Sequence, residues 1–105
     1  MNEIRIIKNE DIKRILLGIP KGHKHIRTII ELNDGSLLIF QEATIANIVR
    51  AYITLVTHPT IEALELYCVK LGRERKRGYA EYQLIETSKS SEQIISEISK
   101  LLNLN

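Results

Sequence analysis

Residues 44–57 read Thr-Ile-Ala-Asn-Ile-Val-Arg-Ala-Tyr-Ile-Thr-Leu-Val-Thr, and they form the most apolar helix that this chain can make. At 100° per residue the polar side chains fall within an arc of about 80°, whereas the apolar side chains span roughly 220°. A surface helix usually buries a stripe only a little over 100° wide. The sequence therefore predicts that this helix is the innermost element, packed on a sheet and, at its flank, on a second helix or another subunit.

Two strands are predicted immediately before this helix, over residues 26–32 and 36–42. Asn33-Asp34-Gly35 joins them, and its Asp and Gly supply the positive backbone angles that a tight hairpin needs. The second strand contains Leu37-Leu38-Ile39-Phe40, which is apolar on both faces. We therefore expect the second strand in the interior of the sheet.

The first 25 residues are predicted to form an edge strand, a short helix and a loop. The β-branched run over residues 3–7 fits the edge strand. Asn9 offers an N-cap for a helix of about two turns, which Gly18 and Pro20 would end. The apolar residues that would share one face of this helix are Ile12, Ile15, Leu16 and Ile19.

Residues 60–71 allow two interpretations. As a strand, apolar and polar side chains would alternate through residues 64–69; as a helix, Thr60 would be the N-cap and Gly72 would close the last turn. The strand is favoured because residues 78–86 also have the character of a strand and need a close partner.

The last element is predicted to be a one-sided helix. Ser90-Ser91-Glu92-Gln93 has the spacing of a capping box, and an apolar stripe follows it up to Leu102. The complete pattern predicts an α+β fold with an antiparallel or mixed sheet of four to five strands, three helices mainly on one face, and a ββα-ββα order after residue 25. With 105 residues, the chain is expected to form a single globular domain over residues 1–105.

The composition favours a cytoplasmic protein. No run approaches the ~20 apolar residues of a membrane span, and the N-terminus carries charges where a signal peptide would be apolar. Cys68 is the single cysteine, so the chain has no CxxC pair for a zinc site; we expect an unreactive thiol in the core. Many isoleucines beside Lys, Arg and Glu suggest a thermophilic source.

Residues with catalytic potential are few. His23 and His25 stand two apart, as in a metal site, but His58 is expected at the other end of the domain, interacting with the negative end of its helix. Asp11 and Asp34 have structural positions in a helix turn and a hairpin turn. We therefore predict no catalytic residue, metal or cofactor, and the sequence leans towards a protein that is not an enzyme.

Positive charge is unevenly distributed along the chain. Residues 28–69 carry Arg50 against five carboxylates, a net charge of −4, whereas the whole chain has +2. The connectivity of the expected sheet would place residues 21–25 and 72–78 at the same end. The candidate residues for binding a polyanion are Lys21, Lys24, Arg27, Arg73, Arg75, Lys76 and Arg77.

The leading functional hypothesis is a non-enzymatic binding or assembly module that forms a homo-oligomer. One alternative is an RNA- or DNA-binding protein that uses the two basic loops; another is a small-ligand enzyme with a site between subunits. Association is expected through an apolar face of the sheet turned away from the helices. The residues predicted on that face are Ile29, Tyr67, Val69, Tyr79 and Ile85, with Phe40 or Ile39.

Overall fold

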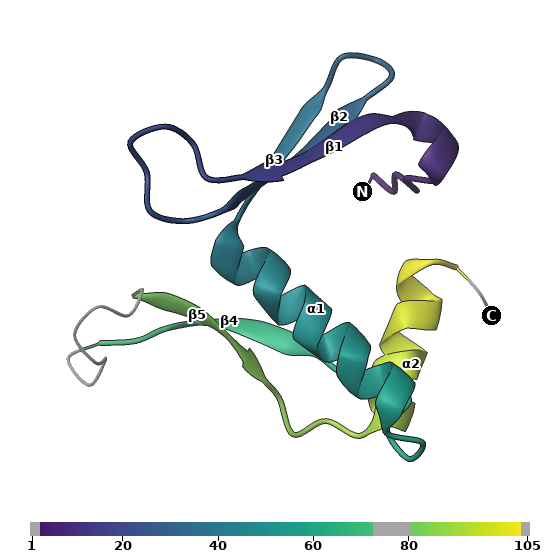
Figure 1. Cartoon of the computed structure of the whole chain (residues 1–105). Coiled ribbons are helices and arrows are strands. Elements are labelled where there is room, and N and C mark those ends of the chain that lie inside the picture. Colours follow the sequence, from purple (N-terminus) through teal and green to yellow (C-terminus); the bar gives the residue numbers. More distant parts are fainter. Residues whose placement is uncertain (1–2, 73–80, 104–105) are drawn as a thin grey trace. The chain divides into compact units, whose positions relative to one another are not determined.

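The computed structural model describes residues 3–72 and 81–103, and it shows an α+β protein. The chain divides into two compact units, Met1–Ile48 and Val49–Asn105, which we call the N-terminal and C-terminal units and describe separately. The described residues form five strands in two antiparallel sheets, together with two α-helices (Figure 1). The predicted single sheet of four to five strands with three helices is therefore wrong. The order of elements after residue 25 is nevertheless strand, strand, helix, strand, strand, helix.

The N-terminal unit contains the larger sheet, in the order β1-β2-β3. Its strands are β1 (Ile12–Gly18), β2 (Arg27–Leu32) and β3 (Leu37–Gln41), and both pairings are antiparallel. The hairpin of β2 and β3 was predicted, but the interior position of β3 was not correct. β2 is the central strand, because β1 pairs with its other edge.

β1 replaces the predicted short helix. A single 3-10 turn, η1 (Asn9–Asp11), precedes it, and the predicted edge strand over residues 3–7 is not formed. Ile15, Leu16 and Leu17 are consecutive apolar residues, which fit a strand as well as one helical face. The register shifts between Ile12 and Arg14, as expected for a β-bulge. Pairing with β2 supplies hydrogen-bond partners along one edge of this segment, and an isolated two-turn helix is marginal in water.

The β2–β3 turn has the predicted positive φ at Gly35 but not at Asp34. Gly35 has a φ of 92°, and its N–H donates to the Leu32 carbonyl at 3.0 Å. The Asp34 carboxylate accepts a hydrogen bond from the Ser36 N–H at 2.9 Å. Asn33 ties the turn to the residues before β1, because its side-chain amide donates to the Glu10 carbonyl at 2.7 Å. The turn therefore fixes the register of β2 and β3 and the entry to β1.

The predicted central helix is present as α1 (Glu42–Thr57), and it begins two residues earlier than expected. Its predicted burial is wrong, since none of its residues is buried. Tyr52 is 65% exposed and Val56 is 62% exposed. The width of the apolar arc indicates that much of the helix surface is apolar, but it does not indicate which element or partner packs on that surface.

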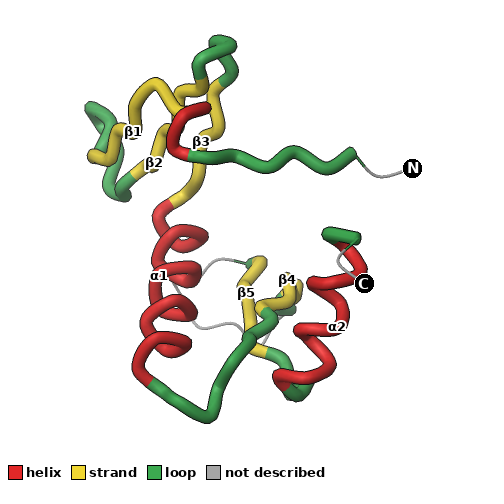
Figure 2. Tube along the Cα trace, turned by 90° about the vertical axis from the view of Figure 1, so that its right-hand side faces the viewer, coloured by secondary structure: helices red, strands yellow, loops and turns green. Residues whose placement is uncertain are grey.

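The C-terminal unit contains β4 (Leu66–Lys70), β5 (Tyr82–Glu86) and α2 (Ser91–Leu101). Of the two interpretations of residues 60–71 the strand is confirmed, although it covers only Leu66–Lys70. Its predicted antiparallel partner is present over Tyr82–Glu86, where Tyr67 lies opposite Ile85 and Cys68 lies opposite Leu84. Figure 2 shows these two strands between α2 and the part of α1 that belongs to this unit.

The capping box of α2 is confirmed. The Ser90 hydroxyl accepts a hydrogen bond from the Gln93 N–H at 3.2 Å, and the Gln93 side chain accepts one from the Ser90 N–H at 2.9 Å. A third contact joins the helix to the segment before β4, since the Ser91 hydroxyl accepts from the Glu62 N–H at 3.1 Å. Two of the otherwise unpaired amide groups at this helix end are thus satisfied.

Ser90→Ala is expected to destabilise the C-terminal unit by about 1 kcal/mol, because it leaves the Gln93 amide without its acceptor. Chemical denaturation followed by circular dichroism measures this. Ser96→Ala is the matched control, because Ser96 is exposed in the interior of the same helix and alanine favours helix there. An equal loss of stability in both variants would contradict a capping role for Ser90.

Few side chains form the core. The buried apolar residues in the described part of the chain are Leu32 in the N-terminal unit and Ala63 and Ile94 in the C-terminal unit. Thr28 is also buried, on the same face of β2 as Leu32, and its hydroxyl lacks a hydrogen-bond partner. Each unit therefore has a very small core for its length.

Candidate interaction surfaces

The first predicted basic loop is a surface turn between β1 and β2. Gly22 has a φ of 83°, and the His23 N–H donates to the Pro20 carbonyl at 2.9 Å, which closes the turn. Lys21 and Lys24 are exposed there. Arg27 begins β2 and is half-buried, with its guanidinium donating to the neighbouring Ile26 carbonyl at 3.4 Å. The loop therefore offers two exposed ammonium groups.

The second predicted basic loop lies outside the described residues, and with it four of the seven candidates: Arg73, Arg75, Lys76 and Arg77. The two loops also belong to different units. Their convergence into one basic surface therefore stays a prediction.

The predicted binding of a polyanion can be tested directly. Changing Arg75, Lys76 and Arg77 to Ala is expected to weaken binding of labelled RNA or DNA and to flatten its dependence on salt, because fewer counterions are released from the phosphates. Fluorescence anisotropy at several salt concentrations measures both. Lys13→Ala, at an exposed position of β1, is the control. Absence of binding at low salt, or an unchanged slope in the triple variant, would rule out a basic binding surface.

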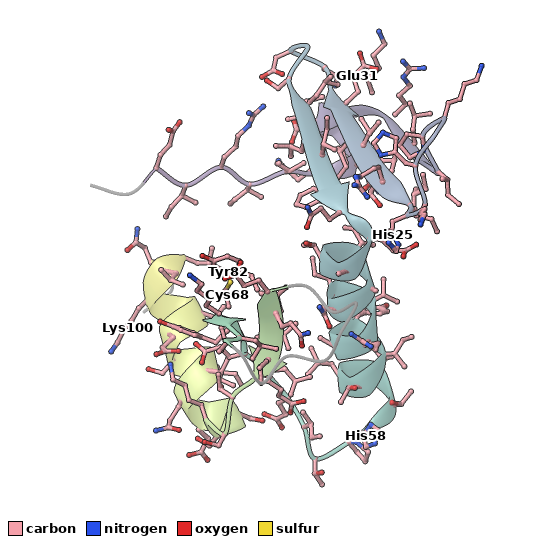
Figure 3. All side chains as sticks on the ribbon, turned by 90° about the vertical axis from the view of Figure 1, so that its left-hand side faces the viewer. His25, Glu31, His58, Cys68, Tyr82 and Lys100 are labelled. Carbon is pink, nitrogen blue, oxygen red and sulfur yellow. The ribbon has the colours of Figure 1, made fainter. Side chains whose placement is uncertain are left out.

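His25 and His58 are engaged in local contacts at the two ends of α1 (Figure 3). The His58 ring nitrogen Nδ1 lies 3.2 Å from the Thr54 carbonyl oxygen, at the C-terminal end of α1. Its predicted interaction with the negative end of this helix is confirmed. His25 lies beside the start of the same helix, with Nδ1 3.4 Å from a carboxylate oxygen of Glu42. Among the described residues, no three His, Cys, Asp or Glu side chains are grouped as metal ligands.

Cys68 differs from its predicted position in the core, because its side chain is exposed. It lies on β4, and it shares a face of the small sheet with Lys70 and Tyr82. The Lys70 ammonium group stands 5.9 Å from the centre of the Tyr82 ring. This face carries a charged residue at each end, because Glu86 lies opposite Leu66 and Lys70 lies opposite Tyr82.

The ionised carboxylates with perturbed pKa values hold structural contacts. The Arg14 guanidinium, whose Nε lies 2.7 Å from Glu31 Oε1, lowers the pKa of Glu31. Hydrogen bonds from Ser36 lower the pKa of Asp34. Each shift stabilises the charged form, whereas a carboxyl that serves as general acid at neutral pH needs a raised pKa. The described carboxylates with shifted pKa values therefore behave as structural anions.

Lys89 joins the segment before β4 to α2 in the C-terminal unit. Its ammonium group lies 3.1 Å from Glu65 Oε2 and 3.0 Å from Glu97 Oε1. The hydrogen bond from Lys89 lowers the pKa of Glu65, and the hydrogen bonds to Glu97 and Glu65 raise the pKa of Lys89. The three charges therefore link the segment before β4 to α2.

This network predicts a specific loss of stability in acid. The folded pKa of Glu65 lies below its unfolded value, so its contribution is complete above the ordinary glutamate pKa of about 4.3 and disappears as the pH falls through the lowered folded value. Glu65→Gln should therefore show a smaller decrease in its urea midpoint over this acid range than the unmodified protein. Glu62→Gln, at an exposed position, should retain the original decrease. Identical acid profiles for all three proteins would contradict the assignment.

The most unusual feature of the surface is the number of exposed large apolar side chains. In the C-terminal sheet, Tyr67, Val69 and Ile85 share one face and are exposed, as predicted. Ile29 belongs to the other sheet, so the predicted continuous face does not exist, and Tyr79 lies outside the described residues. In the N-terminal sheet, Leu37 and Ile39 are exposed on one face of β3. The largest such set lies on α1: Ile48, Val49, Tyr52, Ile53, Leu55 and Val56.

The fold and these surfaces define a small α+β protein with unusually accessible apolar side chains. A comparison with protein-family models, curated proteins and solved structures finds no match to the chain. Neither of the helices in the described residues is long and apolar enough to cross a membrane.

Proposed function

We propose that this protein is a non-enzymatic assembly module that works as a homo-oligomer. The observation that supports this is the imbalance between a minimal core and many exposed apolar side chains. Leu32 and Ile94 are the large apolar residues that the described part of each unit buries, whereas α1 and both sheets expose theirs. Soluble monomers rarely expose contiguous apolar patches above a few hundred Å².

The size of the units leads to the same proposal. Domains of about 50 residues are marginally stable, and the smallest usually need disulfides, metals or oligomerisation. The single cysteine cannot form a disulfide within the chain, and the described residues hold no cluster of metal ligands. Association between copies is a further source of apolar burial.

The small sheet also has accessible edges. Among the described residues β4 and β5 pair only with each other, so each has one edge without a strand partner. A two-stranded hairpin is marginally stable in water, and an open edge accepts strands from other chains. Burial of its apolar face in an assembly would stabilise the hairpin.

The proposal is tested by sedimentation velocity over a range of protein concentrations, together with the concentration dependence of thermal unfolding. An oligomer in the tens of micromolar is expected. Its melting temperature should rise with protein concentration, because association stabilises only the folded chain. A monomer at these concentrations, with a melting temperature independent of concentration, would overturn the proposal.

A further inference from the structure

The apolar side chains of α1 follow the spacing of a helix that packs on another helix. Ile45, Val49, Tyr52 and Val56 are separated by four, three and four residues, so they fall within an arc of about 60°. We call these four residues the α1 stripe. Apolar positions at alternating intervals of three and four form the contact seam of paired helices. The residues that flank this stripe on α1 are also apolar: Ile48, Ile53 and Leu55.

The accessibility of α1 is reversed relative to an ordinary surface helix. Val49, Tyr52 and Val56 of the stripe are exposed, whereas Ile45 at its N-terminal end is half-buried. The half-buried residues on the opposite side of the helix are small or polar: Thr44, Asn47, Ala51 and Thr54. A helix in a monomer normally directs its apolar side inward. The side of α1 that needs cover is therefore the more accessible one.

The charge on α1 helps to identify the occupant. Glu42 and Arg50 are its charged residues, and neither belongs to the stripe. A helix that lies on a membrane surface typically has several Lys or Arg on its polar face, and α1 has one. The stripe therefore needs an apolar partner without complementary charge, and the same stripe on a second copy has this character.

The available area is sufficient for such an interface. The exposed apolar side chains of α1, each about half accessible, represent roughly 500 to 600 Å² per copy, so a pair would remove about 1,000 to 1,200 Å² from water, the lower range of specific interfaces. This area includes the flanking residues, so the two-fold pair has to cover them as well as the stripe.

We infer that the α1 stripe packs against the α1 stripe of a second copy of this chain, which forms a helix-to-helix interface around a two-fold axis. This inference rests on the proposed function, because it names the surface and the partner of the assembly. The interface is isologous, so each stripe residue is buried against stripe residues of the other copy.

Cysteine cross-linking tests the surface in the full chain. In a Cys68→Ser background, Tyr52→Cys places a thiol on the stripe, and Arg50→Cys places one on the polar side of the same helix turn; both positions are exposed. A short bis-maleimide reagent is expected to give a covalent dimer with the Tyr52→Cys protein. The Arg50→Cys protein should remain largely monomeric on a denaturing gel.

Charge substitution provides a second measurement. Val49→Glu combined with Tyr52→Glu should raise the dissociation constant of the dimer by about 100-fold or more, because two unpaired carboxylates per copy would be taken out of water. Arg50→Glu should change this constant by less than about threefold. Circular dichroism checks that helix content is retained, and cross-linking of the Tyr52→Cys protein keeps the test valid if the double variant unfolds.

The outcomes separate this inference from the proposed function. An oligomer that is not cross-linked at position 52 would place the interface elsewhere, which overturns the inference and leaves the proposed function standing. A monomer overturns both. A monomer whose thiol at position 52 is protected from maleimide would show that another part of the same chain covers the stripe.

Discussion

Replacement of Leu32 by alanine is expected to lower the free energy of unfolding of the N-terminal unit by about 2 to 5 kcal/mol. Leu32 is 1% exposed at the end of the central strand, and it is the most completely buried large side chain among the described residues. Removal of its side chain loses apolar burial and leaves a cavity between strands with few other core residues. Hydrogen exchange of the β2 amides measures the loss.

The control for this substitution lies in the same sheet. Leu37→Ala makes the identical chemical change on β3 at a side chain that is 56% exposed, so less than about 1 kcal/mol should be lost. Amide exchange in β4 and β5 should respond less than in β2. A similar loss in both variants would show that Leu32 is not the centre of this core.

Ile94→Ala is expected to have a comparable effect on the C-terminal unit, about 2 to 5 kcal/mol. Ile94 is 5% exposed on the first turns of α2, and it is the buried large apolar residue of this helix. Because Ala63 is the other buried apolar residue described in this unit, little else could compensate for the cavity. Urea denaturation followed by circular dichroism reports the change.

The adjacent residue provides the control for Ile94. Ile95→Ala makes the same substitution one position later in α2, where the side chain is 38% exposed. Its cost should be clearly smaller, because fewer atoms leave an apolar environment. Equal destabilisation by the two substitutions would mean that another surface covers Ile95 in solution. A larger loss for Ile95→Ala than for Ile94→Ala would mean that the face of α2 with Ile95, and not the face with Ile94, packs on the core.

Local sequence signals predicted several elements correctly. The Asn33-Asp34-Gly35 turn required positive φ, and Gly35 provides it. Ser90 and Gln93 satisfied the helix end through side chains three residues apart. These features were predictable because their partners lie within a few residues in the sequence, so their energies do not depend on the remainder of the fold.

The segment of β1 shows where local signals are insufficient. Ile12, Ile15 and Leu16 fit a helical face, but the same residues pair with β2, more than ten residues away in sequence. The Arg14–Glu31 ion pair reinforces this register. Backbone pairing across a sheet is a tertiary interaction, and it overrides a weak helical preference over two turns.

The sequence by itself determined the α+β class, the β2–β3 hairpin, both α-helices and the pairing of β4 with β5. Periodicity, turn residues and caps act over a few residues, so they can be recognised within a short stretch of sequence. The tertiary structure decided the division into two sheets and the exposure of α1. A wide apolar arc indicates only that burial of this helix surface is favourable. The surface that packs on the helix is determined by long-range packing, and most of the apolar stripe of α1 is exposed.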